Sequence, residues 1–158
     1  MTPSPPGVEP VRISVRVRRN VEDAFDLFTR DIGAWWPLDM ASFGGDRACE
    51  LYLEPFVGGR FYERYIDGEE HTAGLVLRWE PPHLVAYTFQ HDDWSAPTEV
   101  EVRFIAEGPS LTRVELEHRA WERLGPIGER MRDMYNNGWP AVISCFATYA
   151  GAADGRPA

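Results

Sequence analysis

An alternation of apolar and polar residues dominates the middle of the chain. Within residues 98–106, Val100, Val102 and Phe104 alternate with charged neighbours. A period of two is typical of strands with one covered and one wet face. Short turn-forming segments separate the apolar runs, which favours an antiparallel meander. The pattern predicts six strands at residues 47–54, 59–66, 72–79, 84–90, 98–106 and 111–119.

The segment before this meander combines one further strand with helical spacing. Residues 11–18 alternate valine and isoleucine with arginine, which predicts a first strand. Asn20 stands where a helix N-cap is expected, ahead of a short helix over about residues 21–29. Residues 31–37 predict a second helical turn or a wide loop that ends at Pro37.

The last part of the chain has helical periodicity. Apolar residues at helical spacing predict a long helix over residues 126–150, with Pro126 at a first helical position. A sheet with one apolar face must bend around such a helix to bury it. We therefore expect an α+β fold in which a curved antiparallel sheet of about seven strands wraps around a long C-terminal helix, with short helices between strands one and two.

The chain of 158 residues is expected to form one domain, because neither a repeat nor a long linker divides it. Residues 1–10 are rich in proline and are expected to be a disordered tail, residues 11–151 the domain, and residues 152–158 a flexible tail. The sequence contains neither an apolar run long enough to span a bilayer nor a secretory signal, so we expect a cytoplasmic protein.

Charge and composition exclude several classes of function. The net charge of −9 repels phosphate backbones, so nucleic acid is not an expected partner. All 16 basic residues are arginine, which excludes lysine Schiff bases and Walker-type phosphate loops. The two cysteines and four histidines fit neither a zinc spacing nor a nucleophilic triad, so no metal, cofactor or catalytic residue is predicted. In particular, His71 is expected near a solvated hairpin turn and His91 at the end of a strand.

Several segments of the chain match a known superfamily. They are residues 20–28 (NVEDAFDLF), Trp35-Trp36-Pro37, residues 54–64 (EPFVGGRFYER), residues 79–82 (WEPP) followed by residues 84–89, residues 112–118 (TRVELEH) and Gly138-Trp139-Pro140. With these segments the chain resembles the START-like or SRPBCC superfamily, whose helix-grip fold is shared with birch-pollen-type allergens. The nearest branch is similar to the homologues of the activator of heat-shock-protein ATPase, close to polyketide cyclase-like proteins. The resemblance implies a cavity between sheet and helix that holds a hydrophobic metabolite.

Bulky apolar residues suggest such a cavity independently, because aromatic rings commonly line small-molecule pockets. The candidate lining residues are Trp35, Trp36, Phe43, Tyr65, Phe89, Trp94, Trp139, Ile143 and Phe146. Packing in the core is the alternative role for each ring. The candidate polar anchors are Arg60, Glu63 and His118. His118 lies on the inward face of its strand, where an apolar surrounding would lower its pKa and allow it to act as a base or to orient a ligand carbonyl.

Three functions follow from these observations. The first is a binding or transport protein for a small hydrophobic or aromatic ligand, with a role in stress response as part of that hypothesis. The second is an enzyme similar to polyketide cyclases or dehydratases that acts in the same pocket. The third is a co-chaperone of a heat-shock ATPase. The resemblance implies this third function through the family's namesake. In that protein the activity looks to depend on a second, N-terminal domain, so we expect no chaperone partner here. A homodimer remains open.

Overall fold

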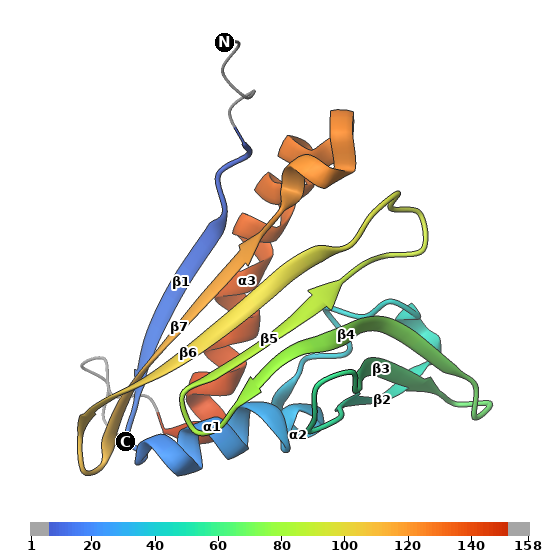
Figure 1. Cartoon of the computed structure of the whole chain (residues 1–158). Coiled ribbons are helices and arrows are strands. Elements are labelled where there is room, and N and C mark those ends of the chain that lie inside the picture. The colour runs from blue at the N-terminus through green and yellow to red at the C-terminus, as the bar shows by residue number, and fades with distance from the viewer. Residues whose placement is uncertain (1–6, 152–158) are drawn as a thin grey trace, which may run out of the picture.

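A single curled antiparallel sheet and a long C-terminal helix make up the fold (Figure 1). The computed structural model describes residues 7–151. Residues 1–6 of the tail predicted over residues 1–10, and the whole tail predicted over residues 152–158, lie outside the described residues. The seven strands lie in the spatial order β1-β7-β6-β5-β4-β3-β2. The strands are β1 (Val11–Val17), β2 (Ala48–Leu53), β3 (Arg60–Tyr65), β4 (Glu70–Glu80), β5 (Leu84–Phe89), β6 (Thr98–Gly108) and β7 (Leu111–Arg119).

Two short helices connect β1 to β2 and close one end of the sheet (Figure 1). They are α1 (Val21–Thr29) and α2 (Ile32–Trp35), and the short 3-10 turn η1 (Gly45–Arg47) follows before β2. The Asn20 side chain accepts a hydrogen bond of 2.7 Å from the backbone N–H of Asp23, as expected of an N-cap. Phe25 and Phe28 of α1 are buried and pack edge-to-face against Phe104 of β6. The predicted cap and helix bounds are confirmed.

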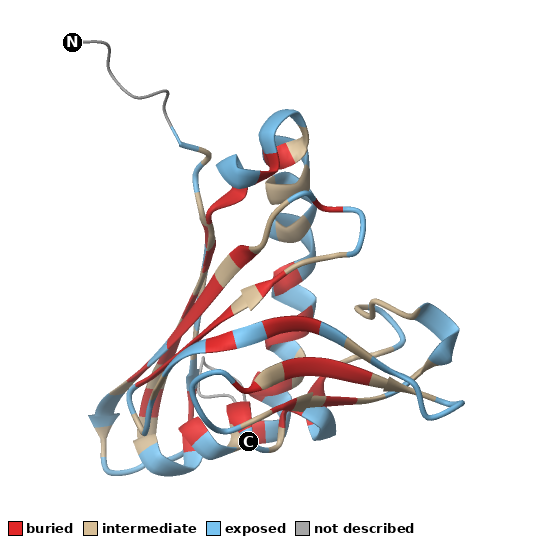
Figure 2. Cartoon of the chain, turned by 45° about the vertical axis from the view of Figure 1, so that its right-hand side comes forward, coloured by how far each residue is buried: buried red, intermediate tan, exposed pale blue. Residues whose placement is uncertain are grey.

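The inner face of the sheet forms one side of the core, and along β7 buried positions alternate with partly exposed ones (Figure 2). In β6 and β7 the pairing brings Val100 opposite His118 and Val102 opposite Leu116, and all four residues are buried. The alternation predicted for these strands is confirmed. The antiparallel seven-stranded sheet predicted from the short connections is confirmed as well.

The C-terminal helix begins two residues later than predicted. A 3-10 segment, η2 (Trp121–Ile127), contains Pro126, and α3 (Gly128–Ala150) follows it. Gly125 has φ 62° and ψ −129°, which are not helical angles, so a helix that ran back through it would be interrupted. Gly128 lies directly over the Trp121 carbonyl, where a Cβ would be 2.2 Å from the oxygen. The close turn between η2 and α3 therefore requires glycine at this position.

The helix α3 lies on the concave side of the sheet and packs against β1, η2 and both short helices (Figure 1). Its buried residues are Gly128, Trp139, Val142, Ile143, Phe146, Ala147 and Ala150. Among residues 7–151, no helix is both long enough and apolar enough to cross a bilayer.

Candidate functional site

A cavity of about 450 Å³ opens between α3, the segment after α2 and the C-terminal end of β5. This volume lies within the usual range for small-molecule sites. The lining residues are Trp36, Met40, Ala41, Ser42, Phe43, Phe89, His91, Met134, Tyr135, Gly138, Trp139, Ala141 and Val142. Met40 and Met134 are 61% and 57% exposed, so these two side chains form the mouth where the cavity meets solvent.

Aromatic rings form two walls of the cavity. On one wall, Trp36 and Trp139 meet edge-to-face, with ring centroids 5.9 Å apart. On the other, Phe43 packs against Phe89 at 5.1 Å and against the His91 ring at 4.4 Å. Ring walls of this kind favour flat, apolar molecules, because such a molecule can contact them over its full face.

The buried carboxylate of Glu63 fixes the segment that carries Phe43. Glu63 lies on β3, is fully buried and accepts hydrogen bonds from Ser42 Oγ at 3.1 Å, Phe43 N at 2.8 Å and Gly44 N at 3.0 Å. A buried carboxylate is tolerated only when donors surround it, and these three donors meet that need. The predicted anchor thus holds the cavity wall from behind, rather than facing the cavity.

A polar pair lies within the otherwise apolar lining. His91 Nε2 and the Tyr135 hydroxyl are 2.6 Å apart, and one residue follows β5 while the other lies on α3. Burial lowers the pKa of His91 below its ordinary value of 6.5, and burial together with the nearby Asp93 raises the pKa of Tyr135. Both side chains are therefore neutral at pH 7.

The other polar groups of the lining are already engaged by the protein. Trp36 Nε1 donates to the Ala41 carbonyl at 2.6 Å, and Trp139 Nε1 donates to His118 Nδ1 at 3.0 Å. Ser42 Oγ donates to Glu63 and accepts from the backbone N–H groups of Gly44 and Gly45. Among the described lining residues, the His91–Tyr135 pair is therefore the polar feature best placed to meet a bound molecule.

His118 faces inward as its strand period predicts, but Trp139 and Phe89 separate it from the cavity. It is fully buried and does not line the cavity. Its Nε2 lies 2.7 Å from Thr98 Oγ1, and its ring lies 4.1 Å from that of Trp121. Burial lowers the pKa of His118 to about 3, so the imidazole is neutral. The expectation that it anchors a ligand directly is not supported by this position.

The sequence-predicted site residues fall into three groups. Four of them line the cavity: Trp36, Phe43, Phe89 and Trp139. Others lie in the core or directly behind the walls: Trp35, Glu63, Trp94, His118, Ile143 and Phe146. Tyr65 lies outside the cavity lining, is partly exposed and stacks on His71 at 6.3 Å. Arg60 points away from the cavity and forms ion pairs with Glu54 at 3.1 Å and Glu70 at 2.9 Å.

Neither His91 nor Tyr135 was predicted from the sequence as a site residue, although both line the cavity. Signals for both were present. His91 continues the inward phase of Tyr87 and Phe89 at a period of two, although β5 itself ends at Phe89. Tyr135 lies three and four residues before Gly138 and Trp139, which is the spacing of one helical face.

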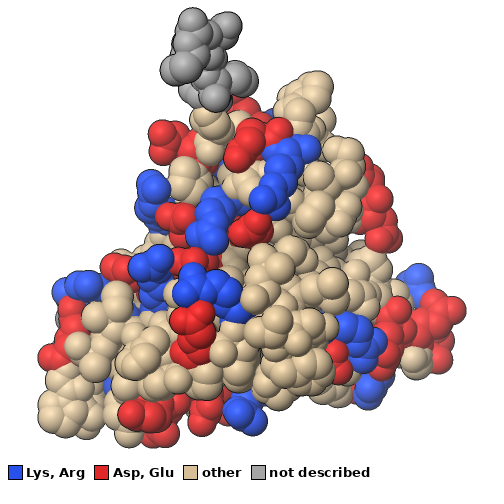
Figure 3. All heavy atoms as spheres, viewed as in Figure 1, with Lys and Arg blue, Asp and Glu red and all other residues tan. Residues whose placement is uncertain are grey.

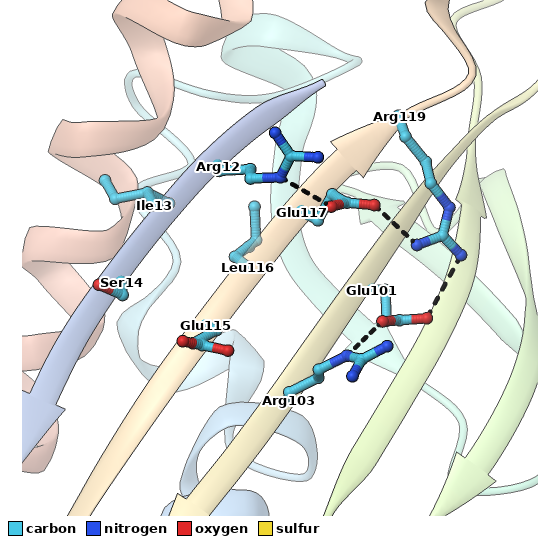
Figure 4. Close-up of a pocket in the computed structure, with 9 residues that line it drawn as sticks. All are labelled: Arg12, Ile13, Ser14, Glu101, Arg103, Glu115, Leu116, Glu117 and Arg119. Atoms are coloured by element: carbon cyan, nitrogen blue, oxygen red, sulfur yellow. Dashed lines mark hydrogen bonds and ion pairs between the residues drawn. The ribbon is translucent and has the colours of Figure 1, made fainter. Parts of the chain in front are cut away.

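A second hollow, of about 400 Å³, lies on the outer side of β1, β7 and β6 and has a different character. Its charged side chains pair with one another, as Figure 4 shows. Arg119 bridges Glu117 at 3.1 Å and Glu101 at 3.3 Å, and Arg103 contacts Glu101 at 2.6 Å. Acidic and basic side chains are intermixed over this face in Figure 3. Paired surface charges of this kind leave little net field for a charged ligand.

The described residues offer no clear place for a metal ion. Within residues 7–151, no three histidine, cysteine, aspartate or glutamate side chains come together in a way that could hold one.

Comparisons with known proteins agree with this architecture. The family model described as activator of Hsp90 ATPase homolog 1-like protein matches residues 18–151. No curated protein matches the chain.

Solved structures show the same fold. The anthrahydroquino-gamma-pyrone synthase Txn09, complexed with SUM, is 35% identical, covers 90% of this chain and 97% of its own, and has a TM-score of 0.61. The self-sacrificing resistance protein CalC from Micromonospora echinospora is 29% identical, with coverage of 89% and 93% and a TM-score of 0.67. The Hsp90 activator PFC0360w from Plasmodium falciparum is 18% identical, with coverage of 91% and 97% and a TM-score of 0.61, a likeness of fold alone.

Proposed function

The chain belongs to the activator of Hsp90 ATPase homolog 1-like family, and we propose that it binds a small, flat, largely apolar molecule in the cavity between α3 and the sheet. The observation that carries this proposal is the cavity itself, which has walls of aromatic rings and one neutral polar pair. The fold is consistent with ligand binding, and the shape of the cavity narrows the class of ligand.

An order-of-magnitude balance shows what the polar pair adds. A ligand that buries about 300 Å² of apolar surface gains roughly 7 kcal/mol at about 25 cal/mol per Å². Association costs at least about 4 kcal/mol in lost translational and rotational freedom. The remainder supports only weak binding, and one hydrogen bond to His91 or Tyr135 adds about 1 kcal/mol and orients the ligand. We therefore propose a ligand with a hydroxyl or carbonyl group on one edge.

The printed name of one similar structure supports an aromatic ligand. Txn09 is named as a synthase of an anthrahydroquino-gamma-pyrone, a fused-ring aromatic compound. Fused rings of that kind match a cavity in which Trp36, Phe43, Phe89 and Trp139 provide flat walls. We extend this ligand class to the present chain as a proposal.

A second candidate function is catalysis in the same cavity, similar to that of polyketide cyclases. The observation that favours it is the His91–Tyr135 pair at 2.6 Å, because an apolar cavity that only binds a ligand does not require two coupled proton carriers. The identity of 35% with a synthase points in the same direction.

The binding proposal can be tested by filling the cavity at a position that tolerates a larger side chain. Gly138 lines the cavity, and a Cβ built there meets no atom within 4 Å. Gly138→Leu should therefore fold normally and weaken binding of anthraquinone by at least about tenfold, measured by quenching of tryptophan fluorescence. Asn137→Leu, at the neighbouring exposed position of α3, is the matched control and should leave affinity unchanged within about twofold.

Native mass spectrometry of the freshly purified protein gives an independent measurement. We expect an apolar compound to accompany the wild-type protein and to be depleted in Gly138→Leu. Equal affinity of the two leucine variants for anthraquinone would place the binding site elsewhere and contradict the proposal.

A further inference from the structure

We propose that His91 and Tyr135 form a proton-transfer pair that enolises a ketone bound in the cavity. The inference rests on the proposed function, because the ketone must first occupy the cavity. It goes further in assigning a chemical step to two residues and in naming the substrate class, an aromatic compound that carries an enolisable carbonyl group.

The spacing of the pair matches the reacting atoms of a ketone. His91 Nε2 and the Tyr135 oxygen are 2.6 Å apart. In a ketone the carbonyl oxygen and the α-carbon are about 2.4 Å apart, as bond lengths of about 1.23 Å and 1.52 Å require. A ketone whose oxygen faces the Tyr135 hydroxyl therefore brings its α-carbon opposite His91 Nε2, within reach of a proton transfer.

The step balances without any further reactant. In the free protein the Tyr135 hydroxyl donates to the unprotonated Nε2 of His91. When the ketone binds, the hydroxyl rotates about its C–O bond and donates to the ketone oxygen instead, which frees the Nε2 lone pair. His91 Nε2 then accepts the proton from the α-carbon as the C–H bond breaks. The electron pair of that bond forms the C=C bond of the enolate, and the negative charge on its oxygen is stabilised by the Tyr135 hydrogen bond. Return of the proton from Nε2 to carbon or to oxygen completes a tautomerisation, so nothing is oxidised or reduced.

The surroundings of His91 suit a base of this kind. Apolar rings flank the imidazole, with Phe43 at 4.4 Å and Trp94 at 5.0 Å, so the free base is neutral at pH 7. Four other titratable groups act on it: the adjacent Asp92 and Asp93, Glu63 and His71. The three carboxylates favour the imidazolium that forms during the step, whereas His71 opposes it.

The Tyr135 ring is held firmly enough to keep the hydroxyl in place. It packs against Trp121 at 5.4 Å, Trp94 at 5.7 Å and His118 at 5.4 Å. These contacts involve the ring and not the hydroxyl, so Tyr135→Phe removes the proposed donor and leaves the packing intact. His91→Gln likewise keeps a polar side chain of similar reach and removes the base.

The test measures exchange of the α-protons of β-tetralone, a bicyclic aromatic ketone, in buffered D₂O by proton NMR. We expect the wild-type protein to accelerate exchange at least about tenfold over buffer, with saturation by β-tetralone, in line with the usual contribution of a positioned base. His91→Gln and Tyr135→Phe should each lose at least about tenfold of the protein-dependent rate. Each variant should still bind anthraquinone, at most about fivefold more weakly than wild type, which is the cost of losing one hydrogen bond. In all three proteins β-tetralone should displace anthraquinone.

Controls separate this inference from the binding proposal. His83→Gln, at an exposed turn between β4 and β5, should exchange β-tetralone at the wild-type rate. The wild-type rate should also rise with pH through a pKa below 6.5, the direction set by burial of His91. Two results would overturn the inference without contradicting the binding proposal. One is exchange at the buffer rate while β-tetralone is bound, and the other is an equal exchange rate in wild type and both variants. Anthraquinone bound without displacement by β-tetralone would overturn the ketone class, and absence of anthraquinone binding would overturn both proposals.

Discussion

Trp139 on α3 donates its indole N–H to Nδ1 of His118 on β7, across 3.0 Å, and this bond determines which nitrogen of the imidazole carries a proton. Because Nδ1 accepts, the proton of the neutral ring is on Nε2, which then donates to Thr98 Oγ1 at 2.7 Å. The Thr98 hydroxyl in turn donates to the Phe89 carbonyl at 2.7 Å. A directed chain of hydrogen bonds thus joins the helix to three strands behind the cavity wall.

The burial of His118 within this series of hydrogen bonds predicts a loss of stability in mild acid. The folded-state pKa of His118 is about 3, below the unfolded value near 6.5, so below about pH 6.5 the unfolded chain binds a proton that the folded chain does not. The contribution of the neutral His118 to the free energy of unfolding is complete above pH 6.5 and is lost as the pH falls toward 3. Between pH 6.5 and pH 5 the loss amounts to about 2 kcal/mol, at about 1.36 kcal/mol per unit. Urea unfolding at the two pH values measures it.

The matched variants for that measurement are His118→Gln and His83→Gln. The first should reduce the pH dependence of the unfolding free energy between pH 5 and pH 6.5, whereas the second, at an exposed turn, should retain it. If His118→Gln showed the same acid sensitivity as the wild type, the buried imidazole would not be its source.

Removal of the Thr98 hydroxyl should destabilise the fold, because this hydroxyl links His118 to Phe89 in the same series of hydrogen bonds. Thr98→Val keeps the shape of the side chain but leaves His118 Nε2 without its acceptor in a fully buried place. We expect a cost of about 1–3 kcal/mol in the free energy of unfolding, the usual penalty for a buried donor without a partner. Thr72→Val, at an exposed position of β4, is the control and should change stability by less than about 0.5 kcal/mol. Equal stability of the two variants would mean that the hydroxyl contributes nothing.

The Glu63 carboxylate should control how well the Phe43 wall is ordered. Glu63→Gln replaces one acceptor oxygen with a donor group, which then faces the Ser42 hydroxyl and two backbone N–H groups. We expect faster hydrogen exchange at the amides of Phe43 and Gly44 and about tenfold weaker binding of anthraquinone. Glu69→Gln, at an exposed position, should change neither. Unchanged amide protection in Glu63→Gln would show that the segment is held by other contacts.

Most of the fold was predictable because it depends on local periodicity. The bounds predicted for the last strand match β7, and the short helix after Asn20 matches α1. The start of β4 was missed because Glu70 and His71 are polar and resemble a turn, yet their backbones pair with β3 opposite Arg64 and Glu63. A partner strand can order residues whose own sequence pattern predicts a turn, and that information is not local.

The site was harder to predict, because the residue type of an aromatic side chain does not determine whether it faces the cavity or packs in the core behind it. Trp35 and Trp36 are adjacent in sequence, yet Trp35 packs against Phe146 in the core while Trp36 faces the cavity. Trp36 follows α2 directly, where neither strand nor helix periodicity applies. His118 has the correct phase to face inward, but the indole of Trp139 lies in front of it.

The two methionines at the cavity mouth have a consequence for selectivity. Met40 lies in the segment after α2 and Met134 on α3, and both side chains are more than half exposed. Unbranched thioethers change shape at little cost, so the opening can widen or narrow for ligands of different girth while the backbone stays still. Oxidation of either sulfur to the sulfoxide would make the mouth of the cavity polar, and oxidising conditions would therefore hinder the entry of apolar compounds.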